Sequence, residues 1–352
     1  LGIDAGTSAV KVCAIAPDGR IVAKAQRPVP VVTALPLWAE IDLERYWVLV
    51  CEALREVAAR AGPVSGIGLS TTCPTTIVLD RDDRPLRGGI VYLDGRADAV
   101  LRDVIGPDAT AYCTRTGNRA SSSTCWAANL TWLQRNEPAL WKKVRRVVML
   151  NSFIGMRLTG KVAIEPTQAS YSGLMDVRAG DAAWSEPLFR LWNVDRALVP
   201  EIVPGHVRVG GVTREAAEAT GLAPDTPVAL GAADTATAAF AVGLKGAGDA
   251  FESVGTSGVI TFCLDEPSFE PSFLNPDGSV RGGFATLAPG FIPLLEKDFP
   301  AIEKISRLVS LQYFGDTFVT SGDSVTRERR IFLADAELFE ILSLPLAEGD
   351  PR

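Results

Sequence analysis

The 352 residues suffice for two domains, since globular domains mostly hold about 100–200 residues. Hydrophobic residues make up 47% and charged residues 22%, which excludes a disordered chain with low hydrophobicity and high net charge. The net charge of −7 argues against a protein that coats nucleic acid with a basic face. A single histidine argues against a histidine-based triad and most metal chemistry.

The sequence shows neither a secretion signal nor a membrane span. It has no charged segment followed by a short apolar stretch, and no run near 18 consecutive apolar residues, the length of a spanning helix. The six cysteines are scattered and form no C-x-x-C pair, which favours reduced thiols over zinc or redox chemistry. We therefore expect a cytoplasmic protein without a membrane or nucleic-acid partner, and a homodimer is left open.

The N-terminal residues have the alternation of a β-meander. An apolar strand over Leu1–Asp4 ends in a carboxylate, and alternating patterns over Val10–Ala14 and Ile21–Ala25 predict two further strands. The stretch Pro17-Asp18-Gly19 predicts a turn, because proline fixes φ and glycine accepts a positive φ. A hairpin directly after the first strand differs from the Gly-rich turn and helix that open a dinucleotide-binding fold.

Helical and strand patterns follow the meander. Apolar residues three or four apart predict a helix over Asp42–Ala61, with Asp42 as its N-cap. Two strands are then predicted, over Val64–Ser70 and Ile77–Asp80. Residues from about 115 to 220 have the pattern of a helix-rich insertion. Its expected elements are helices over 126–136 and 138–146 and a short strand over 147–150.

The opening pattern returns near residue 227. The apolar strand Val228-Ala229-Leu230 runs into a small-residue turn with one acid, Gly231-Ala232-Ala233-Asp234-Thr235. A Gly- and hydroxyl-rich stretch, Ser253–Val259, then precedes a predicted strand over Ile260–Phe262. Two half-chains that each open with a strand, a glycine and an acid indicate an internal duplication.

Two loops are candidates for phosphate binding. They are Asp4-Ala5-Gly6-Thr7-Ser8 and Gly255-Thr256-Ser257-Gly258, in which glycines let backbone N–H groups approach an anion and hydroxyls add donors. The Walker A pattern is absent, and Gly66-Ile67-Gly68-Leu69-Ser70 lacks the third glycine of a dinucleotide loop. Either candidate alone fits an ordinary turn. Their matched positions in the two half-chains favour phosphate binding.

Two acids at strand ends fit the same chemistry. Asp4 could hold Mg²⁺, which takes one or two carboxylates together with phosphate oxygens and water. Asp234 could accept a proton from an attacking hydroxyl, or act as N-cap of a helix over Ala236–Ala241, or do both. Two carboxylates in a cleft also suit glycoside hydrolysis, which would leave both phosphate-type loops without a role.

Several motifs in matching order resemble the FGGY carbohydrate kinases, which belong to the actin and hexokinase superfamily. The stretch Gly2–Lys11 resembles the opening of that family, and the resemblance covers about residues 1–290. The further matching motifs are Trp38-Ala39-Glu40-Ile41-Asp42, Tyr92-Leu93-Asp94-Gly95-Arg96, Leu158-Thr159-Gly160, Ala169-Ser170 to Asp176, Gly231-Ala232-Ala233-Asp234 and Gly255-Thr256-Ser257-Gly258.

The resemblance implies an α/β fold of two actin-like (ribonuclease H-like) domains, each with a mixed five-stranded sheet flanked by helices, and an interdomain cleft. Residues 1–226 would form the sugar-binding domain and 227–352 the ATP-binding domain. We expect the second domain to be incomplete, with missing segments around 290–335. Family members are longer by about one domain's worth of residues, and the chain begins without methionine.

The resemblance further implies ATP-dependent phosphorylation of a sugar hydroxyl by in-line transfer with Mg²⁺. Asp4 would be the Mg²⁺-side carboxylate, and Asp234 both general base and sugar ligand. The residues implied for the ATP phosphates are Gly6, Thr7, Ser8, Lys11, Gly255, Thr256 and Ser257. Those implied for adenosine are Gly322 and Asp323, and those for the sugar are Glu40, Thr72, Asp94 and Arg96.

The expected acceptor is a ketopentose such as xylulose, with another pentulose, a polyol or a glycerol-like substrate as the alternative. The family's ketopentose kinases often carry Met-His-Gly where this chain has Thr71-Thr72-Cys73-Pro74-Thr75, and Tyr92 replaces the commoner tryptophan. A non-catalytic sugar or nucleotide binder on the same scaffold is the alternative from another class. Glu40 and Asp94 could also be solvated loop acids, and Arg96 half of a weak surface ion pair.

Overall fold

The computed structural model describes residues 1–178, 182–244, 246, 249–254, 258–263 and the strand segments 308–310, 317–321, 324–328 and 332–334. The chain divides into two compact units. The first comprises Leu1–Asp249 with Cys263–Arg281, and the second Ala250–Phe262 with Gly282–Arg352.

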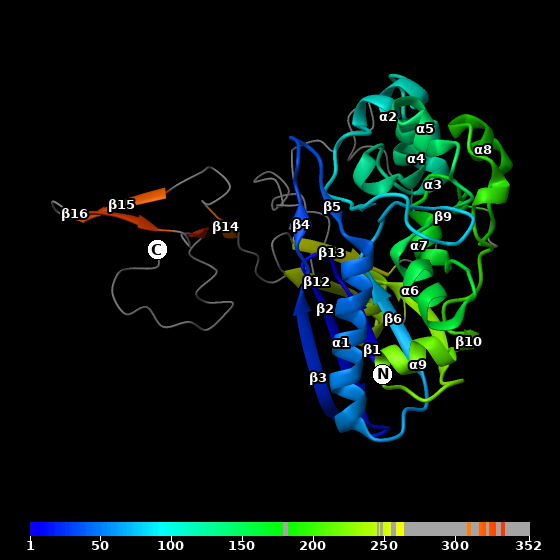
Figure 1. Ribbon diagram of the computed structural model, residues 1–352. Helices are drawn as coiled ribbons and strands as arrows, with labels where there is room; N and C mark the ends of the chain where they lie inside the picture. Colours follow the sequence, from blue (N-terminus) through cyan, green and yellow to red (C-terminus); the bar gives the residue numbers. More distant parts are fainter. Residues whose placement is uncertain are drawn as a thin grey trace. The chain divides into compact units, whose positions relative to one another are not determined.

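The first unit is built on a six-stranded mixed sheet in the order β10-β11-β6-β1-β2-β3 (Figure 1). The predicted meander is confirmed, because β1 (Gly2–Ala5), β2 (Ala9–Ile15) and β3 (Ile21–Pro28) pair in antiparallel order. The turn between β2 and β3 closes where predicted, with Gly19 at φ +85°. These strands place Asp4 near the carboxyl end of β1.

Three strands of this sheet are parallel neighbours. They are β1, β6 (Ile67–Thr71) and β11 (Pro227–Ala233), while β10 (Arg208–Gly211) pairs antiparallel with β11 at the sheet edge. The sheet therefore has one strand more than the five predicted. We predicted that a second domain begins at residue 227, yet β11 belongs to the same sheet as β1, because it pairs with β6.

Three helices share a hydrophobic core with this sheet (Figure 1). They are α1 (Leu43–Ala61), α6 (Leu150–Thr159) and α9 (Arg214–Thr220). The predicted start of α1 is confirmed, because Asp42 Oδ1 accepts a hydrogen bond from Arg45 N at 2.9 Å. The apolar face of α1 packs on β2 and β3, and each fully buried leucine or valine contributes roughly 1.5–3 kcal/mol.

Most of the predicted insertion packs around a second core, which includes the fully buried Trp126 and Trp192 and takes further residues from the chain before the insertion. The helices of this region are α2 (Asp98–Ile105), α3 (Thr110–Thr116), α4 (Trp126–Asn136), α5 (Pro138–Trp141), α7 (Pro166–Ser170) and α8 (Glu186–Trp192), with 3-10 helices over Ser122–Thr124 and Arg196–Leu198. Two small sheets accompany them. One joins β4 (Val31–Val32), β5 (Glu40–Ile41) and β8 (Gly89–Ile90), and the other joins β7 (Ile77–Leu79) with β9 (Arg146–Val148).

Two boundaries in the insertion were predicted wrongly. The helix expected over 138–146 ends at Trp141. The chain turns away there, because Arg145 N donates to the O atom of Leu79, the last residue of β7, at 2.9 Å. The strand expected over 147–150 is β9, and Leu150 already begins α6. The helix predicted over 126–136 is confirmed as α4.

The described part of the second unit consists of antiparallel strand pairs. β12 (Ala250–Val254) pairs with β13 (Gly258–Phe262), which contains the strand predicted over 260–262. The other pairs join β14 (Leu308–Ser310) to β17 (Phe332–Ala334) and β15 (Thr317–Ser321) to β16 (Ser324–Glu328). Among the described helices of the whole chain, none combines the length and apolar character needed to cross a membrane.

Candidate active site

The carboxyl ends of the three parallel strands bring the predicted acids to one edge of the sheet. Asp4 pairs in register with Ser70 of β6, and Ala232 of β11 pairs with the same residue. Thr72 and Asp234 directly follow β6 and β11. In open α/β sheets, ligands bind outside the carboxyl ends of the strands. This edge is therefore the candidate site of the first unit.

The turn after β1 is held in place by its neighbours. Gly6 N donates to Ala9 O at 3.1 Å, and an added Cβ on Gly6 would lie only 3.0 Å from that oxygen. Tyr46 of α1 donates its hydroxyl to Gly6 O at 2.9 Å, and Thr7 Oγ1 donates to Thr72 Oγ1 at 3.2 Å. The predicted first phosphate loop thus has a fixed backbone and lies beside the end of β6.

Asp4 and Lys11 form an ion pair across the meander. They lie opposite each other on β1 and β2, with Lys11 Nζ 3.1 Å from Asp4 Oδ2. Their side chains are 39% and 53% exposed, so both can reach a ligand in solution. The pair places an anion just before the Gly6–Ser8 turn and a cation just after it.

The segment before Asp234 is a strand, which corrects the predicted turn over 231–235. β11 runs to Ala233, and its register with β6 shifts between Ala229 and Ala232. Gly231 has φ +64°, and an added Cβ there would lie 1.7 Å from Leu69 O, so only glycine permits this irregularity.

Asp234 is also not the N-cap of α10 (Asp234–Ala241), as one interpretation of the sequence proposed. Ala233 holds the cap position with φ −56° and ψ 146°, and Asp234 is the first helical residue. Its Oδ1 accepts a hydrogen bond from Thr235 N at 2.7 Å. A carboxylate in the first turn still interacts favourably with the helix dipole.

The surroundings of Asp234 disfavour its charged form. Asp234 is exposed at the sheet edge, but the protein atoms around its carboxylate displace part of its water, and this partial desolvation is the main cause of its raised pKa. The nearby carboxylate of Asp4 raises the pKa further. The hydrogen bond from the backbone of Thr235 opposes this shift. The two predicted acids therefore lie close enough to interact electrostatically across the sheet edge.

Two further side chains respond to the charge of Asp234. Burial raises the pKa of Tyr92, Asp234 raises it further, and a hydrogen bond with Thr7 opposes the shift. Burial also raises the pKa of Cys73, with smaller contributions from Asp234 and Glu165. Neither Tyr92 nor Cys73 was among the predicted site residues. Tyr92 belongs to a motif that resembles the family, and Cys73 to a stretch that departs from it.

The predicted sugar ligands Glu40, Asp94 and Arg96 form a buried network, here called the brace. Arg96 donates to both carboxylate oxygens of Asp94, from Nε at 2.8 Å and from Nη2 at 2.7 Å. Arg96 Nη2 also lies 2.6 Å from Glu40 Oε1, and Ala39 N donates to Asp94 Oδ2 at 2.6 Å.

The side chains of Asp94 and Arg96 are 0% and 1% exposed. The interpretation of Asp94 as a solvated loop acid, and of Arg96 as half of a surface ion pair, is therefore wrong. Both residues lie in the turn between the end of β8 at Ile90 and the start of α2. They meet because the Arg96 side chain folds back onto Asp94.

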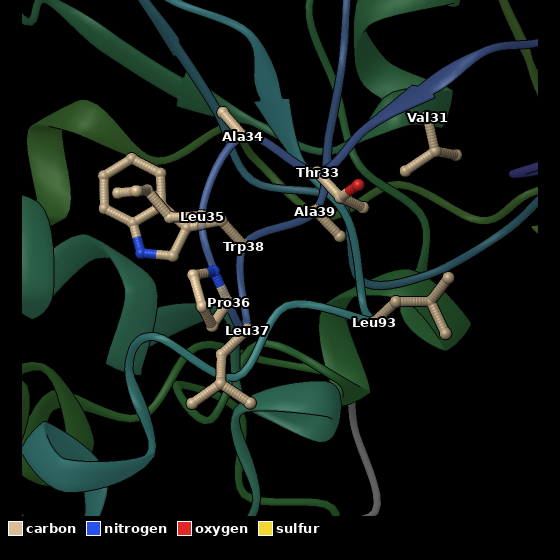
Figure 2. Close-up of a pocket in the computed structure, with 9 residues that line it drawn as sticks. All are labelled: Val31, Thr33, Ala34, Leu35, Pro36, Leu37, Trp38, Ala39 and Leu93. Carbon is tan, nitrogen blue, oxygen red and sulfur yellow. The ribbon is translucent and has the colours of Figure 1, made fainter.

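The brace holds the loop before β5. The Arg96 guanidinium lies 3.7 Å from the centre of the Trp38 ring, and Arg87 bridges Glu40 and Glu137. The loop borders a largely apolar pocket of about 470 Å³ (Figure 2). The pocket is lined by Val31, Thr33, Ala34, Leu35, Pro36, Leu37, Trp38, Ala39 and Leu93.

The remaining predicted site residues lie outside the described residues. These are Gly255, Thr256 and Ser257 of the second phosphate loop, and Gly322 and Asp323 of the adenosine site. The strands that flank the former, β12 and β13, form an antiparallel hairpin, as β1 and β2 do around Gly6–Ser8.

The chain is similar in sequence to proteins of one known family. The sequence model for the N-terminal domain of the FGGY family of carbohydrate kinases matches residues 1–241. Xylulose kinase of Escherichia coli (strain K12) is 30% identical over 263 residues, which are 74% of this chain and 53% of that relative. The chain thus spans about half the length of the curated relatives it matches.

Solved structures give the same result. Xylulose kinase from Rhodospirillum rubrum matches with a TM-score of 0.72 and 30% identity, covering 77% of this chain and 56% of that one. Plasmodium falciparum glycerol kinase with ADP matches with a TM-score of 0.68 and 21% identity, covering 74% and 54%, and this likeness shows the fold alone. The predicted actin-like α/β fold agrees with both.

Proposed function

Because the chain belongs to the FGGY family of carbohydrate kinases, we propose that it phosphorylates a sugar hydroxyl with ATP. The observation that carries the proposal is that Asp4, near the carboxyl end of β1, and Asp234, directly after β11, lie on the same edge of the sheet beside the fixed Gly6–Ser8 turn. A phosphoryl transfer needs mainly positioning and charge neutralisation, and this edge offers groups for both.

Asp234 would act as the general base. Its raised pKa lies nearer to neutrality than that of an exposed aspartate, which strengthens the carboxylate as a proton acceptor. In the proposed in-line transfer, a sugar hydroxyl donates its proton to Asp234 while its oxygen attacks the γ-phosphorus of ATP. The bond from that phosphorus to the β–γ bridging oxygen breaks, and ADP leaves on the side opposite the sugar. Tyr92, whose pKa responds to the charge of Asp234, and Thr7, which hydrogen-bonds with Tyr92, would orient the sugar or the phosphates.

The residues fit a magnesium ion supplied with ATP. Asp4 and Asp234 repel each other enough to raise the pKa of Asp234, a cost that a divalent cation would offset. Within the described part of the chain, no group of three or more histidine, cysteine or acidic side chains could hold a metal by itself. Mg²⁺ typically takes one or two carboxylates and completes its shell with phosphate oxygens and water. Asp4 would hold the ion, which would neutralise charge on the phosphates.

We propose the predicted roles for Lys11, the first phosphate loop and Thr72, and a changed role for Asp94 and Arg96. Lys11 and the Gly6, Thr7 and Ser8 turn would contact the ATP phosphates from the first unit. The brace suggests an indirect role for Asp94 and Arg96, because their charged atoms already bind one another. They would fix the turn that carries Tyr92, while Thr72 would contact the sugar.

We propose a ketopentose such as xylulose as the acceptor, with another pentulose, a polyol or a glycerol-like compound as the alternative. Relatives named xylulose kinase support the first choice. The chain carries Thr72, Cys73 and Pro74 where ketopentose kinases often carry a histidine motif, and this difference supports the alternative.

A panel of sugars tests the proposal on the full-length protein. ADP release is measured with ATP and Mg²⁺ against pentuloses, polyols and hexuloses. We expect at least one sugar to raise ADP release well above the sugar-free rate. If no sugar raises it, the kinase proposal fails, and binding of a sugar without turnover would instead support the non-catalytic binder.

A further inference from the structure

We propose that Glu165, Thr167 and Gln168 form a positioning clamp that fixes the candidate base Asp234 relative to Thr72. The three residues lie at the start of α7, and their side chains form hydrogen bonds to backbone and side-chain groups near Thr72 and Asp234 rather than to the carboxylates of Asp4 and Asp234. This inference rests on the proposed kinase function and adds residues to it that act through others.

The first arm of the clamp reaches the end of β11. Thr167 Oγ1 accepts a hydrogen bond from Ala233 N at 2.7 Å, one residue before Asp234. The same hydroxyl donates to the carboxylate of Glu165, with 2.8 Å to either oxygen. A hydroxyl has one proton to donate and lone pairs to accept with, so both contacts can exist together.

The second arm reaches the end of β6. Gln168 Nε2 donates to Thr71 Oγ1 at 2.7 Å and to Thr71 O at 3.0 Å, and lies 3.5 Å from Thr72 O. Gln168 is fully buried. The short helix α7 thereby contacts the ends of β6 and β11, the two strands that Thr72 and Asp234 directly follow.

Glu165 orients the Thr167 hydroxyl and the first turn of α7 through hydrogen bonds. Its side chain caps α7 by accepting from Thr167 N at 2.7 Å and Gln168 N at 2.8 Å. An ionised carboxylate only accepts hydrogen bonds, so it turns the Thr167 proton toward itself and leaves the Thr167 lone pairs for Ala233 N. Glu165 is 1% exposed, and burial raises its pKa against the lowering effect of these hydrogen bonds. Its charge also raises the pKa of Cys73, which places it beside the site.

Thr167→Val tests the clamp in the full-length protein, because valine keeps the shape and removes the hydroxyl. We expect kcat to fall by about 10–100-fold, since a small displacement of a catalytic group can cost about 10²-fold. The acid limb of the pH–rate profile should also shift, because the surroundings of Asp234 change. Thr167→Ser restores the hydroxyl and should return both values to near wild type.

Thr131→Val is the matched control, because the Thr131 hydroxyl also forms a hydrogen bond inside the first unit, donating to Trp192 O at 3.0 Å in the helical core away from the site. It should lower the melting temperature comparably and leave kcat and the pH limb unchanged. Equal loss of stability in Thr167→Val with an unchanged kcat and pH limb would overturn the clamp.

A second measurement separates the clamp from the kinase proposal. Amide hydrogen exchange at 231–235 should become faster in Thr167→Val than in Thr131→Val and wild type, because Ala233 N loses its acceptor. Unchanged exchange there overturns the clamp whether or not the protein transfers phosphate. Faster exchange in a protein that no sugar activates would support the clamp and contradict the kinase function.

Discussion

The proposed base, Asp234, lies in surroundings that raise its pKa, so its carboxylate is a stronger proton acceptor and is protonated at a higher pH. Partial desolvation and the charge of Asp4 both disfavour the charged carboxylate, so Asp234 keeps its proton to a higher pH than a fully solvated aspartate, whose pKa is about 3.9. A general base works only without its proton. The direction of the pKa shift therefore fixes the direction of the pH dependence.

We expect kcat/KM for the sugar to fall as the pH is lowered, with an apparent pKa above that of an ordinary aspartate. Lowering the pH through the raised pKa protonates Asp234 and removes the base. A pH profile of kcat/KM at saturating Mg·ATP reports this ionisation in the enzyme before the sugar binds. A limb at or below about pH 4 would contradict the raised pKa.

Removal of the Tyr46 hydroxyl should change both the stability of the protein and its binding of ATP. The hydroxyl donates to Gly6 O at 2.9 Å while the residue is 1% exposed. Tyr46→Phe should lower the free energy of unfolding by about 0.5–1.5 kcal/mol, because Gly6 O loses its donor. The loosened turn should also raise KM for ATP. Urea denaturation and ATP kinetics measure the two effects, and unchanged values in both would contradict the role of Tyr46.

At the scale of elements, the brace joins the loop before β5 to the turn before α2. Its ion pair between Asp94 and Arg96 is buried, so each charge depends on the other. Removing one partner of a buried pair leaves an uncompensated charge, whereas removing one partner of an exposed pair costs little. The brace can therefore be tested by comparing two similar substitutions.

Asp94→Asn should lower the free energy of unfolding by about 3–5 kcal/mol, because it removes the charge of the bidentate partner of the buried Arg96 and leaves only the partly exposed Glu40 to balance the guanidinium. Asp103→Asn is the control, since Asp103 pairs with Arg135 at 2.6 Å but both side chains are largely exposed. Its effect should stay below about 1 kcal/mol. Chemical denaturation of both variants decides the matter, and equal effects would show that the brace contributes no more than a surface pair.

Local signals predicted most elements of the first unit. Alternation and turn residues predicted the meander, and helical spacing with Asp42 predicted α1. The failures have long-range causes. The helix from Pro138 ends early because Arg145 N bonds to Leu79 O, and β11 extends because Gly231 packs against Leu69 O. No pattern within a short window contains such contacts.

At the scale of the whole molecule, the carboxyl ends of β1, β6 and β11 form the edge on which the proposed chemistry depends. Motif order, through the resemblance, pointed to Asp4, Thr72 and Asp234, and the structure brings these three together. Thr167 and Gln168 were missed, because their contacts lie 66 and 97 residues away in sequence. The burial of Asp94 and Arg96 was missed for the same reason.

The central claim is that Asp234 serves as the base of a sugar kinase, and Asp234→Asn tests it most directly. Transfer of the γ-phosphoryl group of ATP to the best sugar is measured in the full-length protein, with Asp103→Asn as the surface control. We predict that Asp234→Asn lowers kcat by about 10²–10⁴-fold while the melting temperature stays near wild type. Asp103→Asn should transfer at the wild-type rate. Wild-type turnover by Asp234→Asn would contradict the account.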